Sequence, residues 1–293
     1  MSEFIGTKLT MNLGERSYDI IVKSGSLENL YQFARLDRRV AVVTDSGVPA
    51  QYAQMVADQC KDAHIITVPQ GEASKSFKIL ESVLKQMLEF GMGRGDLVIA
   101  VGGGVVGDLA GFAASIYMRG IDFINGLAEA VKAGLLADPE LFSIFEKEDV
   151  DDRIGDIICR SLRFKKSIVE QDETEQGMRK ALNFGHTIGH GIEAVKGIKG
   201  RRTTGLFHGE CVALGMLPMI ESKALQKRVR NVYRRLGLPT RTAYDKEKVL
   251  AEMLHDKKAQ DGQITIIKVP GLGCWRAETI PVEGLRPLLG MED

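Results

Sequence analysis

The sequence has few cysteines, no long apolar run and no leader-like N-terminus, and each absence excludes a class of protein. Its four cysteines, Cys60, Cys159, Cys211 and Cys274, are far apart and form no CxxC pair. This spacing argues against a zinc ribbon or a disulfide framework and predicts a reducing, cytoplasmic compartment. No apolar run reaches the roughly 18 residues of a membrane span. The first residues lack the basic and then apolar pattern of a signal peptide.

An excess of charge of one sign is also missing. The chain of 293 residues has 39 lysines and arginines and 39 aspartates and glutamates. Balanced charge exerts no long-range attraction on a polyanion, so we expect no nucleic acid as the main partner. Two residue types stand out instead. Glycine is abundant, with 32 residues, and three of the five histidines fall within positions 186–208. The chemistry is therefore sought around these glycines and histidines.

The first part of the chain alternates strand and helix patterns. Apolar runs at 40–44, 65–68 and 97–101 predict buried strands, and residues 49–59 and 76–90 have helical periodicity. Such alternation is typical of a parallel sheet covered on both faces. Ahead of it, two short strand-like stretches around residues 14–17 predict a hairpin.

From about residue 126, helical periodicity dominates. It runs through five segments, 127–137, 152–170, 179–195, 209–225 and 226–236, and one late strand is expected at 264–269. We therefore predict two domains. Residues 1–124 form an α/β domain with a Rossmann-like parallel sheet, and residues 125–293 form a mainly α-helical domain.

A glycine-rich loop, Gly102–Asp108, follows the third apolar strand and opens a helix. Glycines at this position let backbone amides approach a phosphate at the helix N-terminus, but the same glycines also suit a tight strand-to-helix turn. Two further strand ends carry polar residues, namely Asp45 and the segment Gly71–Lys75. Because ligands of open α/β sheets bind at the carboxyl ends of the strands, the three loops together predict a binding edge.

The histidine cluster favours a metal site. His186 and His190 are one turn apart on an expected helix, and His208 begins another helical run. A catalytic zinc takes three nitrogen or oxygen ligands, and a carboxylate such as Glu129 could complete the set. Each of these residues alone would more often be an ordinary core or surface side chain. There is no HExxH, so the common metalloprotease pattern is excluded.

Cationic side chains lie near these motifs, and they would suit a phosphorylated or carboxylated substrate. Taken singly, each is typical of a solvated surface charge. They are Arg119, Lys132, Lys165, Arg179, Lys257 and Lys258.

Together, these motifs resemble the 3-dehydroquinate synthase family of the sugar-phosphate cyclase superfamily. The glycine-rich loop alone would also suit glycerol dehydrogenases and iron-dependent alcohol dehydrogenases, whereas the complete set is specific. The matching segments occur in the family's order: Gly71–Lys75, Gly102–Gly111, Tyr117–Gly120, Gly126–Lys132, Asn183–His190, His208–Glu210 and Asp256–Lys258.

The resemblance implies an NAD-binding α/β domain followed by a helical metal- and substrate-binding domain, usually in a homodimer. It implies a lyase of the shikimate pathway, in aromatic amino acid biosynthesis. The reaction converts 3-deoxy-D-arabino-heptulosonate 7-phosphate to 3-dehydroquinate and phosphate. NAD transiently oxidises one substrate alcohol, which acidifies the neighbouring C–H and allows phosphate to leave. A Zn2+ or Co2+ ion acts as a Lewis acid, and the ring then closes by an aldol step.

The resemblance also implies residue roles. It places the metal on Glu129, His186 and His208, and His190 becomes a polar partner of the substrate instead of a ligand. Arg119 resembles an arginine that reaches the neighbouring subunit's substrate. Substrate groups would be held by Lys132, Lys165, Arg179, Asn183 and Lys258, the last favoured over Lys257. NAD would contact Asp45, Glu72, Lys75, Gly104, Val105 and Asp108.

The chain departs from the family between Ile124 and Asn125, where an internal segment is absent. In the family, this segment contributes sheet strands, threonines and an aspartate at the cofactor, and lysines at the substrate. Three interpretations follow. The chain is a 3-dehydroquinate synthase, another cyclase of the kind that makes inosose or valiolone rings, or an inactive remnant with a metal-binding or scaffolding role.

Overall fold

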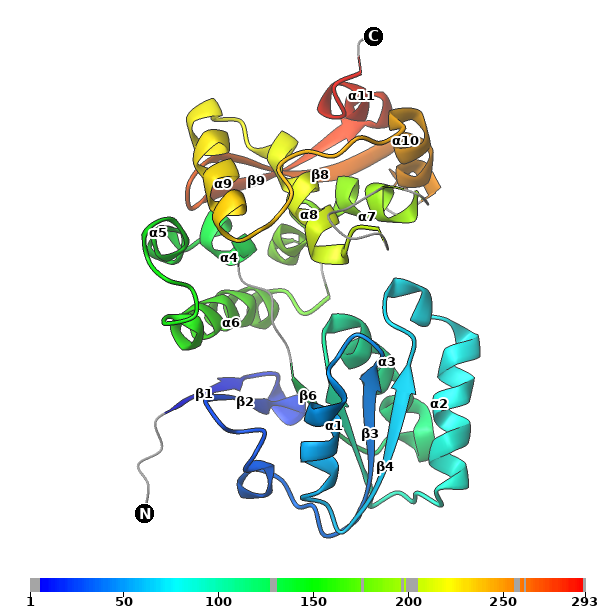
Figure 1. Cartoon of the computed structure of the whole chain (residues 1–293). Coiled ribbons are helices and arrows are strands. Elements are labelled where there is room, and N and C mark those ends of the chain that lie inside the picture. The colour runs from blue at the N-terminus through cyan, green and yellow to red at the C-terminus, as the bar shows by residue number, and fades with distance from the viewer. Residues whose placement is uncertain are drawn as a thin grey trace. The chain divides into compact units, whose positions relative to one another are not determined.

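The computed structural model describes residues 6–126, 131–174, 177–195, 198, 205–255, 259–260 and 262–291 (Figure 1). The chain divides into two compact units. The first comprises Met1–Gly6 and Lys23–Ala128, and the second comprises Thr7–Val22 and Glu129–Asp293. No helix among the described residues is long and apolar enough to cross a membrane.

The first unit is built on a four-stranded parallel sheet. Its strands are β3 (Arg39–Asp45), β4 (Asp62–Val68), β5 (Leu97–Val101) and β6 (Asp122–Gly126), in the order β4-β3-β5-β6. The two central strands, β3 and β5, are buried along nearly their whole length. This confirms that the apolar runs at 40–44 and 97–101 are interior strands of an α/β sheet, whereas the run at 65–68 lies in β4, a partly buried edge strand.

Helices cover both faces of this sheet (Figure 1). Helix α1 (Ala50–Ala57) packs on one face, and α2 (Phe77–Glu89) and α3 (Gly104–Ile116) pack on the other. The chain therefore leaves β3 and β5 toward opposite faces. The carboxyl ends of these two strands form a topological switch point, which is where open α/β sheets bind ligands.

The second unit is mainly helical, as expected. Its helices are α4 (Val131–Leu136), α5 (Pro139–Lys147), α6 (Ile154–Gln171), α7 (His186–Ala194), α8 (His208–Met216), α9 (Lys223–Arg235), α10 (Lys246–His255) and α11 (Leu285–Leu288). A three-stranded sheet of β7 (Ala259–Gln260), β8 (Gln263–Gly271) and β9 (Cys274–Pro281) closes the unit. The expected strand at 264–269 is the centre of β8, and its antiparallel partner β9 was not expected.

Two expected helices are interrupted. Segment 179–195 divides into the 3-10 helix η5 (Met178–Asn183) and α7, because Gly185 adopts a left-handed φ of 79° between them. In segment 209–225, α8 ends at Met216 and is followed by the 3-10 helix η6 (Leu217–Met219), which contains Pro218. The next helix, α9, begins after Ser222, which caps it.

The remaining 3-10 turns are η1 (Gly14–Arg16), η2 (Leu30–Gln32), η3 (Glu72–Ser74), η4 (Tyr117–Arg119) and η7 (Val282–Gly284).

The N-terminal hairpin of β1 (Gly6–Met11) and β2 (Tyr18–Lys23) packs with the second unit, although it comes first in the chain. The backbone amide of Asn12 donates a 2.6 Å hydrogen bond to Glu170 on α6. Arg16 forms a 2.6 Å ion pair with Glu173 just beyond that helix. The hairpin is therefore fastened to α6 by polar contacts.

A bidentate ion pair joins α5 to α9. Arg228 donates from Nε and one terminal nitrogen to the two carboxylate oxygens of Glu146, each at 2.8 Å. The guanidinium also lies 5.3 Å from the ring centre of Phe142, which is fully buried. The hydrogen bond from Arg228 lowers the pKa of Glu146 below its ordinary value. Two parallel bonds fix both side chains in one geometry.

We expect Glu146→Gln to lower the free energy of unfolding by about 1 kcal/mol at pH 7. Because the pKa of Glu146 is lower in the folded state, its contribution is present above the unfolded pKa of about 4.3 and is lost as the pH falls through the folded pKa. Urea denaturation at neutral and acidic pH measures both effects. The exposed Glu283 provides the control variant Glu283→Gln. The prediction would be contradicted if both variants lost the same free energy of unfolding. It would also be contradicted if the difference in stability between Glu146→Gln and the unchanged protein did not depend on pH.

Candidate active site

Glycines bring α7 and α8 into direct backbone contact. A Cβ atom on Gly189 would lie 2.9 Å from the Cα of Val212, and one on Gly215 would lie 2.2 Å from the carbonyl oxygen of Gly185. Neither distance is possible for a real side chain, so these positions require glycine. The helices therefore approach closely, and side chains at the margin of the contact meet each other.

The three histidines meet at this margin. His186 and His190 come from α7, and His208 begins α8. The ring centres are 5.4 Å apart for the pair on α7 and 5.6 Å from each of them to His208. One nitrogen from each ring lies within 4.8 Å of one from the others. The three histidines of positions 186–208 therefore form one cluster in the structure.

Two of these rings are held through Nδ1. In His186, Nδ1 lies 3.2 Å from the carbonyl oxygen of Phe184, and in His208, Nδ1 lies 2.7 Å from Oε2 of Glu193. Burial, helped by the positive charge of Lys132, lowers the pKa of His186 to about 2. The ring is therefore neutral at physiological pH, which is the form that binds metals. Sequence reasoning missed Glu193, although it lies one turn beyond His190.

The residues expected at the substrate lie on several elements of the second unit, and of these Lys132 is close enough to His186 for its charge to act on that ring. Lys132 on α4 is partly buried and donates a 2.7 Å hydrogen bond to the carbonyl of Leu182. Asn183 ends η5, just before α7, and is partly buried. Arg179 in η5 donates from its guanidinium to the carbonyl of Glu173. Lys165 is exposed on α6. Glu129, Lys257 and Lys258 lie outside the described residues.

In the first unit, the glycine-rich loop separates into two kinds of glycine. A Cβ on Gly102 would lie 2.8 Å from the side chain of Val106, so packing alone explains that position. Gly103 and Gly104 have nothing within 4 Å of an added Cβ, and neither adopts a positive φ. A tight turn does not require them. Their lack of side chains leaves the amides at the start of α3 open to a ligand.

An ion network joins two of the strand-end loops. Nζ of Lys75 lies 3.1 Å from Glu72, in η3, and 2.9 Å from Asp108 on α3. Burial disfavours the charged form of Lys75, but the hydrogen bonds and charges of Asp108 and Glu72 outweigh it and raise the pKa of Lys75. Val105, partly buried, lies on the first turn of α3. Three of the expected cofactor contacts are therefore brought together in this unit.

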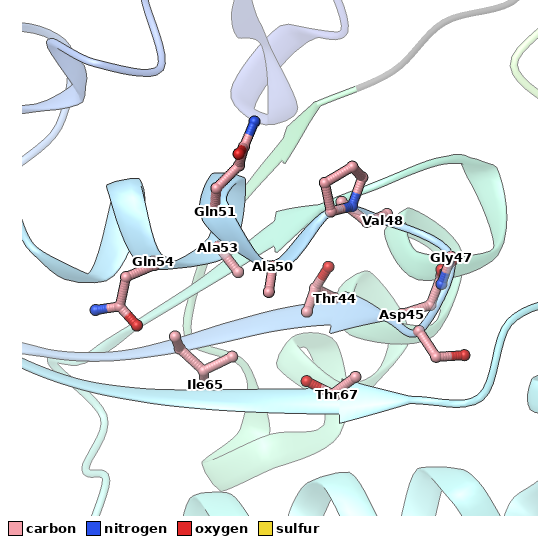
Figure 2. A pocket seen from close by; sticks show the side chains of 12 residues that line it. Thr44, Asp45, Gly47, Val48, Ala50, Gln51, Ala53, Gln54, Ile65 and Thr67 are labelled. Atoms are coloured by element: carbon pink, nitrogen blue, oxygen red, sulfur yellow. The ribbon is translucent and has the colours of Figure 1, made fainter.

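Asp45 ends β3 and lines a pocket of about 710 Å3 between β3, β4 and α1 (Figure 2). Its side chain is mostly buried, with 8% of the residue exposed, and Oδ1 accepts a 2.7 Å hydrogen bond from the amide of Gly47. The hydroxyl of Thr44 donates to the carbonyl of Val101 on β5. The pocket combines these polar groups with the apolar side chain of Ile65.

The turn before β6 is strained. Met118 and Arg119 adopt left-handed φ angles of 49° and 70°, followed by Gly120 at 106°. Each non-glycine residue in this region costs on the order of 1 kcal/mol. The buried hydroxyl of Tyr117 anchors the turn through a 2.9 Å hydrogen bond to the carbonyl of Met92. The guanidinium-bearing Arg119 is left exposed.

Family models cover most of the chain. The 3-dehydroquinate synthase N-terminal model matches residues 65–137, and the 3-dehydroquinate synthase C-terminal model matches residues 126–259. The 3-dehydroquinate synthase of Streptococcus mutans is 32% identical and that of Streptococcus sanguinis 33%, each over 96% of this chain and 99% of the relative. Both alignments span 357 positions, more than the chain's 293 residues, so this chain lacks an internal part that the relatives have.

Solved structures share the fold. A 2-deoxy-scyllo-inosose synthase complexed with carbaglucose-6-phosphate, NAD+ and Co2+ aligns with a TM-score of 0.77 at 18% identity, over 97% of this chain and 99% of that one. The 2-epi-5-epi-valiolone synthase from Streptomyces hygroscopicus, with NAD+ and Zn2+ bound, gives a TM-score of 0.73 at 20% identity, over 95% and 98%. The predicted fold class, an α/β domain followed by a mainly helical one, is confirmed.

The close contact of α7 and α8 predicts a strong effect of Gly189→Ala. The added methyl group would force the backbones apart, and we expect the free energy of unfolding to fall by about 1–3 kcal/mol. Thermal denaturation measures this. In the control, Gly155→Ala on α6, the methyl group meets nothing within 4 Å, and we expect unchanged or slightly higher stability. A Gly189→Ala protein as stable as the control would show that the helices do not touch there.

Proposed function

Because this chain belongs to the 3-dehydroquinate synthase family, we propose that it converts 3-deoxy-D-arabino-heptulosonate 7-phosphate to 3-dehydroquinate and phosphate. The observation that carries the proposal is the cluster of His186, His190 and His208 beside Lys132, in a chain whose two family models are those of this lyase. The activity would serve the shikimate pathway of aromatic amino acid biosynthesis.

The histidine cluster fits a Zn2+ or Co2+ ion. Neutral imidazole nitrogens with a carboxylate are a donor set that both ions accept. His186 is neutral because of burial, and its Nδ1 is hydrogen-bonded to a backbone carbonyl. The unprotonated Nε2 is therefore the atom that would bind the metal. We assign the ligands to His186, His208 and Glu129. A bound metal would supply Lewis-acid polarisation of a substrate oxygen, and a bound NAD would accept and return a hydride.

The residues around the cluster would bind the substrate. The positive charge of Lys132 is close enough to His186 to lower the pKa of that histidine. The ammonium group of Lys132 can therefore bind a substrate carboxylate or hydroxyl next to the metal. His190 faces the same space and can hold or move a proton there. The remaining substrate contacts are assigned to Lys165, Arg179, Asn183 and Lys258.

In the first unit, NAD would bind at the carboxyl ends of the strands. The amides at Gly104 and Val105 would meet the pyrophosphate, and Asp45 at the end of β3 would accept hydrogen bonds from a ribose. Glu72, Lys75 and Asp108 already form one ion network at the same strand ends. These contacts belong to residues 1–124, which we assign as the NAD-binding domain, and residues 125–293 would bind metal and substrate.

The proposed enzyme acts as a homodimer in the cytoplasm. The turn at Met118 and Arg119 has an unfavourable backbone conformation, and the side chain of Arg119 is exposed there. Strain of this kind is often found at functional sites. An exposed arginine on this turn suits a contact with the substrate of a neighbouring copy.

The first test is phosphate release. Incubated with NAD, Zn2+ and the heptulosonate phosphate, the purified chain should release inorganic phosphate, and His208→Ala should not, because it removes a metal ligand. A colorimetric phosphate assay measures the rate. Release no higher than that of His208→Ala would favour the inactive remnant. Release from a different sugar phosphate, but not from this one, would favour another cyclase.

The second test is metal content. We expect about one zinc per chain. Glu129→Gln should lower the zinc content, whereas His190→Ala should keep the zinc and lose phosphate release, since His190 is assigned to the substrate. Elemental analysis of dialysed protein gives the numbers. Full zinc retention in Glu129→Gln together with loss in His190→Ala would instead make the site a three-histidine centre.

A further inference from the structure

Glu193 stands directly behind His208. It lies on α7 three residues after His190 and seven after His186, so the three side chains share one face of the helix. Its Oε2 atom lies 2.7 Å from Nδ1 of His208, across the contact between α7 and α8. Both side chains are partly buried, with 30% of His208 and 21% of Glu193 exposed. None of the motifs from the sequence assigned a role to Glu193.

The hydrogen bond to Glu193 decides which nitrogen of His208 carries the proton. A carboxylate can only accept hydrogen bonds, so Nδ1 must donate, and the lone pair of the neutral ring is then on Nε2. The ring of His186 is fixed in the same way, because the carbonyl of Phe184 can also only accept. Both rings therefore present the same nitrogen as a possible ligand.

The two acceptors differ in charge. The carbonyl of Phe184 is neutral and belongs to the main chain, whereas Glu193 brings a negative charge. A charged acceptor makes a stronger hydrogen bond and makes the imidazole a better electron donor. Among the ion pairs of the described residues, Glu193 pairs with His208 and with no lysine or arginine. A divalent cation on the far side of the ring would balance this partly buried charge.

We propose that Glu193 is a positioning residue of the metal centre. It holds His208 as the Nδ1–H tautomer, aims Nε2 at the metal and offsets part of the metal's charge. The inference rests on the proposed function, since it requires a metal at the histidine cluster.

The first experiment uses metal-free full-length protein with 15N-labelled histidine. Long-range 1H–15N spectra distinguish the two tautomers, and comparison with His208→Ala assigns the signals. We expect the Nδ1–H form for His208 in the unchanged protein and a shift toward the Nε2–H form in Glu193→Ala. Glu193→Gln should keep the Nδ1–H form, because the amide oxygen still accepts. An unchanged His208 tautomer in Glu193→Ala would overturn the proposal.

The second experiment measures zinc affinity by competition with a chromophoric chelator. We expect Glu193→Ala to weaken binding by about 10–100-fold, and Glu193→Gln by less, because it keeps the acceptor and loses only the charge. The visible spectrum of the Co2+-loaded protein should change in both variants. Glu146→Gln is the control, because it removes a carboxylate from the same unit without touching His208.

The outcomes separate the two proposals. If the unchanged protein does not bind zinc, both the metal centre and the role of Glu193 are wrong. If it binds zinc and Glu193→Ala binds equally well with the same Co2+ spectrum, the metal centre stands and the role of Glu193 is wrong. If Glu146→Gln weakens zinc binding as much as the Glu193 variants, the effect reflects general destabilisation, and the proposal fails.

Discussion

The backbone contact between α7 and α8 is the constraint on which the rest of the candidate site depends. His186 and His190 come from one helix and His208 from the other, and their rings meet because glycines remove the side chains that would keep the helices apart. The same contact lets Glu193 reach across to His208. A larger residue at Gly189 or Gly215 would move the three histidine rings apart although the histidines themselves are unchanged.

Much of this arrangement could be predicted from the sequence, because it depends on local patterns. The continuous apolar runs that became β3 and β5 identified the parallel sheet, and the spacing of His186 and His190 placed both on one face of a helix. The approach of His208 could not be predicted from spacing. It depends on a helix crossing that only the resemblance to the 3-dehydroquinate synthase family indicated.

Some features of the second unit were not predicted from the sequence, among them β9, α5 and two breaks in helical segments. Strand β9 has exposed and partly buried residues along its length, so it shows no apolar run. Helix α5 was overlooked although Asp138 caps it and Pro139 begins it, a recognisable start signal. The breaks at Gly185 and Pro218 lie inside segments whose apolar periodicity continues across them. Periodicity reports which face is buried, and it does not report where the backbone turns.

The N-terminal hairpin has a consequence for the order of folding. The amide of Asn12 bonds to Glu170, 158 residues further along the chain. The main part of the first unit, Lys23–Ala128, therefore lies in the sequence between two parts of the second unit. During synthesis, the parallel sheet can form as soon as residue 126 has left the ribosome, whereas the hairpin can make its contacts with Glu170 and Glu173 only after α6 has been synthesised. Closing such a long loop is entropically costly, so we expect the second unit to be the slower to mature.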